Sequence, residues 1–307
     1  MSKNLTPQIS ALDTFLSFSE QYKPEFDVYL ASVLSASYTD KRQLLADSMN
    51  YSCINKGKRV RPLLSIASAL LFEENVQDIL PFSAALEMIH TYSLIHDDLP
   101  AMDNDDFRRG QPTNHKRFGE DMAILAGDCL LTLAFEVMST QLSPQFDAKE
   151  ILASIQYLSK ECGQIGLIGG QVLDINHEGT SEESTLKKIH KLKTGALIKT
   201  AIVVPALLYK ADPKQITLLE EFGKKIGLLF QIVDDILDVT QTSEALGKTA
   251  NKDLEQNKLT YVRLYGLDKS KELVRETATE ALDTLEKLTL DTKALTHFVR
   301  FFSDRTF

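Results

Sequence analysis

The chain has 307 residues, a charged fraction of 25% and a formal net charge of −9. This length is enough for one large core, and an acidic balance of this size argues against nucleic acid as the main partner. The three cysteines, Cys53, Cys129 and Cys162, are too few and too scattered for a disulfide framework or a cysteine-based metal site. We expect them to be small buried side chains in a reducing compartment.

The chain begins with MSKNLTPQIS, which has no basic stretch followed by an apolar run, so we expect no signal peptide. We find no stretch that approaches the ~20 apolar residues of a membrane span, and we expect no stable membrane insertion. Together these features predict a cytoplasmic protein. No linker or repeat of fixed period divides the chain, so we expect a single domain over residues 1–307.

Apolar positions spaced by three and four run through most of the chain, which predicts an all-α fold. Alternating strand patterns are almost absent, and residues 201–208 form the one ambiguous apolar run. Many long helices around an apolar interior can enclose either a plain core or a deep central cavity. The expected helices cover residues 25–48, 60–73, 76–98, 117–141, 147–163, 184–210, 212–242 and 257–289.

The first motif along the chain is the basic segment Gly57-Lys58-Arg59-Val60-Arg61-Pro62. Because Pro62 marks the start of a helix, the free N–H groups and the positive end of the helix dipole add to these cationic side chains. The segment therefore suits an anionic ligand such as a phosphate.

An acidic cluster, Asp97-Asp98-Leu-Pro-Ala-Met-Asp103, follows the apolar helix over residues 76–98. A straight helix would turn Asp103 about 120° away from Asp97. Pro100 disfavours helical geometry at the residue before it, so we expect the helix to end near Asp98. A loop should then bring Asp103 back towards Asp97. Arg108-Arg109-Gly110 follows as a basic segment.

A second acidic cluster, Asp234-Asp235-Ile-Leu-Asp238, ends another long apolar helix. Asp234 and Asp238 are four residues apart and share one face of that helix. Earlier in the chain, Lys193-Thr194-Gly195 interrupts a helical run, where threonine and glycine indicate a local break. Lys248 and Lys258 lie in a polar segment after the second cluster.

Crowded carboxylates at the ends of apolar helices repel one another, and a divalent cation relieves this repulsion. Oxygen ligands without cysteine or histidine suit Mg²⁺, which keeps waters and bridges to phosphates. One such acidic cluster alone is typical of a solvated surface or of helix caps. Each basic segment alone is likewise typical of a solvated surface. Two clusters alternating with basic segments indicate two polyanions, one bridged by metal and one held by side chains.

These motifs resemble the trans-isoprenyl diphosphate synthase family, and most closely its bacterial farnesyl diphosphate synthases. Asp97 to Asp103 with Arg108-Arg109-Gly110 resembles the first aspartate-rich motif, and Phe230 to Asp238 the second. The basic segment from Gly57, then His90, and Lys193-Thr194-Gly195 follow in family order. The resemblance covers residues 25–265 and implies the isoprenoid synthase fold, a single large bundle of long helices around a deep central cavity, and a homodimer.

The resemblance also implies a role for each matching residue. The implied substrates are isopentenyl diphosphate and an allylic diphosphate, and the implied cofactor is Mg²⁺, with three ions per active site. The residues implied for isopentenyl diphosphate are Lys58, Arg61, His90 and Arg109. Those implied for the allylic diphosphate are Arg108, Lys193, Lys248 and Lys258. Those implied for Mg²⁺ are Asp97, Asp103 and Asp234, with Asp98 and Asp238 closely associated. Thr194 and Gln231 would direct oxygen dipoles at the reacting carbons, and with Lys193 and Arg108 they complete the implied catalytic set.

The expected activity is head-to-tail condensation, in which the allylic substrate loses diphosphate and its cation is attacked by isopentenyl diphosphate. Tyr92 lies five residues before Asp97, about 7.5 Å along a helix. A bulky ring there, next to Ser93, would stop the growing chain, and the resemblance associates an aromatic at this place with a C15 product. Tyr92 can also be an ordinary core aromatic, so geranyl and geranylgeranyl diphosphate remain alternative products.

Two features depart from the family pattern. Asn251 and Asn257 stand where the family has glycines, which makes the placement of Lys258 less certain, although asparagine tolerates left-handed geometry. The aromatic C-terminal segment from Phe301 to Phe307 has no assigned role.

Three other classes of protein remain open from the residues. In an HD-type metal phosphohydrolase, His90 and His96-Asp97 would form the metal site, but Asp234 to Asp238 would have no purpose. A terpene cyclase or head-to-head condensing enzyme would not need Lys58 and Arg61 for a second diphosphate. A helical scaffold would bind neither substrate.

Overall fold

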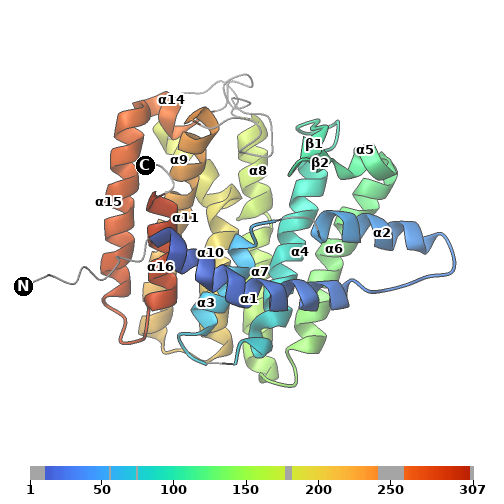
Figure 1. Cartoon of the computed structure of the whole chain (residues 1–307), viewed down its shortest axis with the longest axis horizontal. Helices are drawn as coiled ribbons and strands as arrows, with labels where there is room; N and C mark the ends of the chain where they lie inside the picture. The colour runs from blue at the N-terminus through green and yellow to red at the C-terminus, as the bar shows by residue number, and fades with distance from the viewer. Residues whose placement is uncertain (1–10, 55–56, 74, 177–181, 241–258, 305–307) are drawn as a thin grey trace, which may run out of the picture.

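The computed structural model describes residues 11–54, 57–73, 75–176, 182–240 and 259–304 of the chain. In these ranges the regular secondary structure is helical apart from one short hairpin, as Figure 1 shows. The hairpin pairs β1 (Phe107–Arg108) with β2 (Gln111–Pro112) in antiparallel register. The all-α fold is therefore confirmed.

The first part of the chain folds as expected except near its start and just before residue 120, where a separate short helix precedes the long one. Its elements are α1 (Ala11–Val33), α2 (Arg42–Cys53), α3 (Val60–Ala69), the 3₁₀ helix η1 (Val76–Ile79), α4 (Leu80–Asp97), α5 (Asn114–Phe118) and α6 (Glu120–Gln141). The expectation of one helix over residues 25–48 is wrong, because the chain leaves the helix after Val33 and starts α2 at Arg42. The segment between them is rich in Ser, Thr and Asp, which favour turns.

Helix α1 also runs through Pro24, where a boundary was expected. A proline inside a helix costs about 3 kcal/mol. Phe15, Phe18, Phe26 and Leu30 are spaced at helical intervals and are all buried. Their packing offsets the local cost of the proline, so tertiary contacts decide where this helix ends.

The second part of the chain contains two helices that were not expected, α8 and α16. Its elements are α7 (Ala148–Cys162), α8 (Leu167–Asn176), α9 (Glu183–Lys193), α10 (Gly195–Leu208), α11 (Pro213–Thr240), α14 (Tyr261–Tyr265), α15 (Leu267–Leu285) and α16 (Lys293–Asp304). The predicted break at Lys193-Thr194-Gly195 is confirmed, since α9 ends and α10 begins there. The run expected over residues 257–289 is divided at Gly266, whose φ of 78° suits glycine.

Helix α10 lies at the centre of the bundle and packs against α3, α7 and α11. Every residue of α10 except Lys199 and Leu207 is buried. A helix that is buried on all sides has no polar face, which explains why its apolar run was ambiguous in the sequence. The surrounding helices contribute to one buried cluster that extends from Phe15 to Phe302.

The aromatic segment near the C-terminus belongs to this core. In Figure 1, α16 lies beside α1 and α11. The Phe301 ring stacks on Phe15 with a centroid distance of 3.7 Å, and the Phe298 ring meets Phe15 edge-on at 5.2 Å. These rings therefore join the two ends of the described chain.

Helix α6 corrects the expectation that no stretch resembles a membrane span. It has 22 residues and a mean hydropathy of 1.6 in its most apolar window, so by length and composition alone it could cross a membrane. In this fold, 39% of that window is buried, and the helix packs against α4 and α2. Ile124 and Leu125 remain exposed on its surface.

Candidate active site

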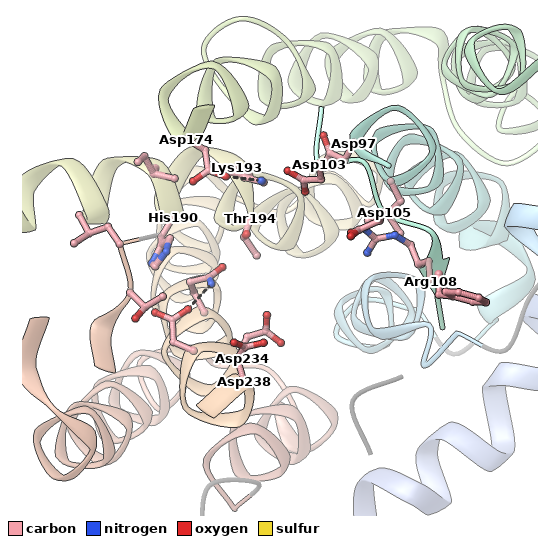
Figure 2. Close-up of a pocket in the computed structure, with 17 residues that line it drawn as sticks. Asp97, Asp103, Asp105, Arg108, Asp174, His190, Lys193, Thr194, Asp234 and Asp238 are labelled. Atoms are coloured by element: carbon pink, nitrogen blue, oxygen red, sulfur yellow. Dashed lines mark hydrogen bonds and ion pairs between the residues drawn. The ribbon is translucent and has the colours of Figure 1, made fainter. Parts of the chain in front are cut away.

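The two acidic helix ends line one cavity of about 230 Å³. Figure 2 shows Asp97 and Asp103 on one side of it and Asp234 and Asp238 across from them. The cavity is lined by Leu94, Asp97, Asp103, Asp105, Phe107, Arg108, Asp174, Ile189, His190, Lys193, Thr194, Gln231, Asp234, Asp235, Asp238, Leu259 and Thr260.

The first cluster has the loop that the sequence predicts. Helix α4 ends at Asp97, and Asp98 is its C-cap residue. The N–H of Asp103 donates to the carbonyl oxygen of Asp97 at 2.8 Å, and the N–H of Asp105 donates to that of Asp98 at 3.2 Å. Asn104 takes a φ of 48°, a left-handed geometry that asparagine tolerates. The loop thus returns Asp103 to the end of the helix and places Asp97 and Asp103 in the same cavity.

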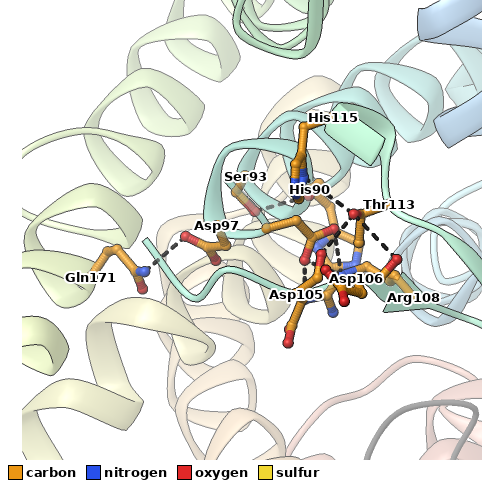
Figure 3. A network of polar contacts seen from close by, with 10 residues as sticks. His90, Ser93, Asp97, Asp105, Asp106, Arg108, Thr113, His115 and Gln171 are labelled. Atoms are coloured by element: carbon orange, nitrogen blue, oxygen red, sulfur yellow. Dashed lines mark hydrogen bonds and ion pairs between the residues drawn. The ribbon is translucent and has the colours of Figure 1, made fainter. Parts of the chain in front are cut away.

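The Asp97 carboxyl is the most strongly perturbed carboxyl of this cluster. Burial raises its pKa to about 6, although the cation of Lys193 acts in the opposite direction. Gln171 of α8 donates a hydrogen bond from Nε2 to Asp97 Oδ1 at 2.7 Å (Figure 3). The carboxylate is therefore held in place and needs further positive charge to be stable in its ionised form.

Asp98 has a different environment from its neighbour. It is buried, and Arg108 Nε donates to its two oxygens at 2.7 and 2.9 Å. Asp98 does not line the cavity, whereas Arg108 does. Its predicted association with metal stays a prediction, while its observed contact orients Arg108. The β1–β2 hairpin holds this arginine, and Arg109 and Gly110 in its turn both have positive φ.

The second cluster is carried by the last turns of α11. Asp234 and Asp238 face the cavity, in agreement with their spacing. Asp235 lies between them and accepts hydrogen bonds from the N–H of Tyr261 at 2.7 Å and from Gln231 Nε2 at 2.9 Å. Because the Gln231 side-chain N–H donates to Asp235, the carbonyl oxygen of this side chain is the atom left to face a ligand.

Lys193 and Thr194 enter the cavity from the break between α9 and α10. Lys193 Nζ lies 2.7 Å from Asp174 Oδ2 of α8. Burial lowers the pKa of Lys193, but Asp174 and Asp97 outweigh this effect, so its pKa is raised and it stays charged. His190, one turn earlier, has its pKa lowered to about 3 by burial and is neutral.

Gln171 and Asp174 are site residues that the sequence analysis missed. They are two polar residues three positions apart in the apolar segment Leu167–Asn176, so they share one face of α8. That spacing is the signal that could have identified them. Through them, α8 supports both Asp97 and Lys193.

A separate group of cations lies beside the aspartates. Arg61 Nη1 is 3.2 Å from His90 Nε2. The Arg109 guanidinium lies so close to Gly57 that a Cβ at this glycine would be 2.9 Å from Arg109 Nη1. Burial, and after it the positive charges of Arg61 and Arg109, lower the pKa of His90 well below its usual value. His90 is therefore neutral. The structure thus brings together three of the four residues predicted to bind isopentenyl diphosphate.

The fourth, Lys58, is exposed at the N-terminal side of α3. Its neighbour Arg59 is buried and has a φ of 52°. Arg59 donates to Asp27 of α1 at 2.8 Å, to Glu87 of α4 at 2.7 Å, and to the Cys53 carbonyl oxygen at 2.7 Å. Arg59 therefore fixes the chain at the start of α3, where Lys58 and Arg61 lie.

The two predicted chain-length residues lie on α4 ahead of Asp97. Tyr92 is 6% exposed, and its ring centroid is 5.8 Å from that of His96. Within the described residues, Tyr92 Oη has no hydrogen-bond partner. Ser93 is half-buried, and its hydroxyl donates to the His90 carbonyl oxygen at 2.9 Å (Figure 3). Neither residue is in the lining of the cavity.

The histidines of the phosphohydrolase hypothesis do not form a common site. His90 contacts Arg61, whereas His96 Nε2 lies 3.0 Å from the Ile124 carbonyl oxygen of α6. Lys248, Lys258, Asn251 and Asn257 lie outside the described residues, so their predicted roles are not tested.

The donor set of the cavity fits Mg²⁺. Seven aspartates line it, together with two cations, Arg108 and Lys193. Among the residues that the structure describes, no three Asp, Glu, His or Cys side chains converge closely enough to hold a metal ion by themselves. This arrangement suits an ion that retains waters and completes its coordination with substrate phosphate.

Comparison with known proteins gives a family match over most of the chain. The polyprenyl synthetase model matches residues 42–297. A farnesyl diphosphate synthase from Micrococcus luteus is 49% identical over 252 residues, which cover 82% of this chain and 86% of that protein. A chloroplastic geranylgeranyl pyrophosphate synthase from Catharanthus roseus is 49% identical over 241 residues, which cover 78% of this chain and 67% of that protein. Identity alone therefore leaves the product length open.

A solved structure extends the similarity to the fold. The geranyltransferase from Helicobacter pylori, crystallised with magnesium and isoprenyl diphosphate, matches with a TM-score of 0.82 and 32% identity. The match covers 94% of this chain and 96% of that one. The likeness thus includes the helices that carry both acidic clusters.

Proposed function

The chain belongs to the polyprenyl synthetase family, whose members are prenyltransferases, and we propose that it makes (2E,6E)-farnesyl diphosphate. In this reaction, dimethylallyl and then geranyl diphosphate condense head to tail with isopentenyl diphosphate, and diphosphate is released. The observation that carries the proposal is a single cavity with an aspartate cluster on each side and a group of arginines beside it. This arrangement suits two diphosphates held in different ways.

The allylic diphosphate would bind between the two acidic clusters. Asp97, Asp103 and Asp234 would hold Mg²⁺, with Asp238 beside them and Asp98 acting through Arg108. When bound, Mg²⁺ (three ions per active site in this proposal) supplies Lewis-acid stabilisation of a diphosphate leaving group. The proposed side-chain partners of the same diphosphate are Arg108, Lys193, Lys248 and Lys258.

The carbon skeleton would react in the part of the cavity near Thr194 and Gln231. Their oxygens are dipoles that can stabilise positive charge on the allylic carbons without forming a bond to them. Leu94, Phe107, Ile189 and Leu259 supply apolar surface in the same cavity. Exclusion of water by such surface protects an allylic cation from hydrolysis.

Isopentenyl diphosphate would bind to the separate group of cations. Arg61, Arg109 and Lys58 would hold its phosphates, and the neutral His90 can donate a hydrogen bond. The double bond of this substrate attacks the allylic cation, and the proton that is then lost passes to the departing diphosphate. No nucleophilic side chain is needed for these steps.

We place the product at C15 because Tyr92 is bulky, buried and five residues before Asp97. The relatives named geranylgeranyl pyrophosphate synthases favour a C20 product as a second candidate. Tyr92→Ala should lengthen the product to C20 or more. Tyr92→Phe is the matched control, since it keeps the ring and removes only a hydroxyl without a described partner. Mass spectrometry of the products decides the matter, and identical spectra for wild type and Tyr92→Ala would refute the role of Tyr92.

We also propose a homodimer. Ile124 and Leu125 on α6, and Ile168 and Val172 on α8, are about half exposed. Both groups flank the last turn of α4, since His96 contacts α6 and Asp97 contacts α8. Exposed apolar side chains that lie near one another are typical of an interaction surface, and we propose that these four belong to one.

The function is tested by incubating the protein with isopentenyl diphosphate, Mg²⁺ and either the C5 or the C10 allylic diphosphate. We expect farnesyl diphosphate from both allylic substrates, and loss of turnover in EDTA. Undiminished turnover in EDTA would contradict the metal role. Release of phosphate from nucleotides without any condensation product would instead favour a phosphohydrolase.

A further inference from the structure

A second cavity, which we call the lysine pocket, lies between α9, α10 and α11 and has a volume of about 280 Å³. His190 lines this pocket and the active cavity, so the two share one side chain. None of the residues that line this pocket has a role in the proposed reaction. The lysine pocket is lined by Lys187, His190, Lys191, Gly195, Lys199, Lys224 and Leu228.

Four lysines surround this pocket in a chain whose net charge is −9. Lys187 pairs with Glu183, and Lys199 Nζ lies 2.7 Å from Glu161 Oε1. Within the described residues, Lys191 and Lys224 form no ion pair. Two carboxylates therefore balance four ammonium groups, which leaves an excess of two positive charges. Such an excess suits a ligand with a compact dianionic group.

The surface that lines the pocket is mostly apolar. Leu228 is half-buried there, and Gly195 is buried and adds no side chain to the lining. The Lys199 side chain is only 16% exposed, and its ammonium group lies 5.7 Å from the centre of the Tyr157 ring. Lysine stems add to this apolar surface while their charged ends stay near water. At about 280 Å³ the pocket is near the lower end of ligand-binding cavities, about 300 to 1,000 Å³.

We propose that the lysine pocket binds a phosphorylated short hydrocarbon chain. Its phosphate would lie between Lys191 and Lys224, and its chain would lie against Leu228. A run of lysines on a flat helix face would attract anions without selecting for a hydrocarbon. A cavity that combines lysines with a mostly apolar lining can select for both the phosphate and the hydrocarbon. The assignment of the hydrocarbon as an isoprenoid rests on the proposed function; the requirement for a phosphate and an apolar chain does not.

The test is isothermal titration of geranyl monophosphate in EDTA against wild type and two double variants. Lys191→Ala/Lys224→Ala removes the two unpaired lysines. Lys188→Ala/Lys214→Ala removes two exposed lysines from the same helices but outside the pocket. We expect wild type and the control variant to bind one equivalent more than Lys191→Ala/Lys224→Ala. Equal stoichiometry in all three proteins would overturn the proposal.

A second titration, with inorganic phosphate, tests the apolar half of the proposal. We expect phosphate to bind wild type at least tenfold more weakly than geranyl monophosphate does. Equal affinity would assign the pocket to free phosphate and refute the hydrocarbon. Prenyl transfer by the two double variants should equal that of wild type. Because the titrations do not depend on turnover, they remain readable even if the proposed product or reaction is wrong.

Discussion

At Asp97, burial and ionisation oppose each other. Burial raises the pKa of this carboxyl to about 6, whereas an unfolded chain would show about 3.9. The folded state therefore binds a proton more tightly than the unfolded state does. Below about pH 4 the Asp97 carboxyl is protonated in both states, and its ionisation does not lower the free energy of unfolding. As the pH rises to about 6 the loss of unfolding free energy grows, and above that pH it stays at its full value.

Asp97→Asn should therefore inactivate the enzyme and stabilise it at the same time. Asparagine can still accept from Gln171 but carries no charge, so in EDTA at pH 8 the variant should gain up to about 3 kcal/mol in unfolding free energy. The gain should vanish at pH 4, and turnover should fall by about 10²-fold or more. Urea denaturation at both pH values measures this. Asp283→Asn, an exposed change, is the control, and equal stability of Asp97→Asn and wild type at pH 8 would contradict the account.

Arg59 illustrates a residue that acts through its neighbours. It adopts left-handed geometry and joins α1, α4 and the end of α2 through its three donors. Lysine at this position would keep the charge but lose the planar fork that reaches all three acceptors. Breaking a buried ion pair costs about 3 to 5 kcal/mol, and a displacement of about 1 Å at a binding residue can cost 10²-fold.

Arg59→Lys should raise the KM for isopentenyl diphosphate by about tenfold or more, with a smaller change in the KM for geranyl diphosphate. The reason is that Lys58 and Arg61 lose their support, whereas the aspartate clusters keep theirs. Steady-state kinetics with each substrate varied in turn measures the difference. Arg42→Lys, at an exposed ion pair with Asp40, should change neither value. A parallel rise in both KM values would mean that Arg59 supports the whole fold and not this subsite.

At the scale of elements, both acidic helix ends could be predicted from the sequence because local rules decide them. Pro100 ends α4 near Asp98, and the spacing of Asp234 and Asp238 places them on one face of α11. The break at Thr194 likewise follows from a threonine and a glycine in a helical run. In each case the residues that set the geometry are adjacent in the chain.

The elements that were missed depend on contacts between distant residues. Helix α1 passes through Pro24 because its phenylalanines pack against α16, more than 250 residues later in the sequence. Helix α8 is short, and its role appears only when Gln171 meets Asp97 and Asp174 meets Lys193. The position of Arg59 between Asp27 and Glu87 likewise cannot be predicted from a local sequence pattern, because these residues are far apart in the chain.

The packing of α1 against α16 gives a prediction about stability. Phe298 is fully buried and meets the rings of Phe15 and Phe18 edge-on at 5.2 and 5.7 Å. Phe298→Ala should cost about 3 to 5 kcal/mol in unfolding free energy, because it leaves a cavity. Leu16→Ala, at an exposed position on α1, should cost less than about 1 kcal/mol. Denaturation curves of both variants test this, and similar costs would show that the two helices are not tightly packed.

At the scale of the whole molecule, the charge is divided between regions. The active cavity has seven aspartates and two cations, whereas the neighbouring group around Arg61 and Arg109 is cationic. An acidic protein can therefore receive two anionic substrates, one through bound metal and one through side chains. The net charge of −9 predicts the local charge of neither site. The order of the motifs along the chain was therefore more informative than the composition.

Apolar surface is also unevenly distributed over the molecule. Ile124 and Leu125 on α6 lie on one side of the last turn of α4, and Ile168 and Val172 on α8 lie on the other. Val28 on α1 is more exposed than any of them, at 72%, but it lies on a different helix from this group. A stable interface between two copies would bury about 1,600 Å² in total, which requires a set of neighbouring side chains and not one exposed residue.

Leu125→Lys/Val172→Lys should therefore convert the proposed dimer into a monomer. The two side chains are 51% and 53% exposed in the single chain, so the lysines are tolerated there, but a dimer would bury their charges at a cost of several kcal/mol. Sedimentation velocity at micromolar concentration measures the mass of each species. Val28→Lys is the matched control and should leave the dimer intact. A wild-type protein that sediments as a monomer, or a double variant that remains dimeric, would show that this surface does not join two copies.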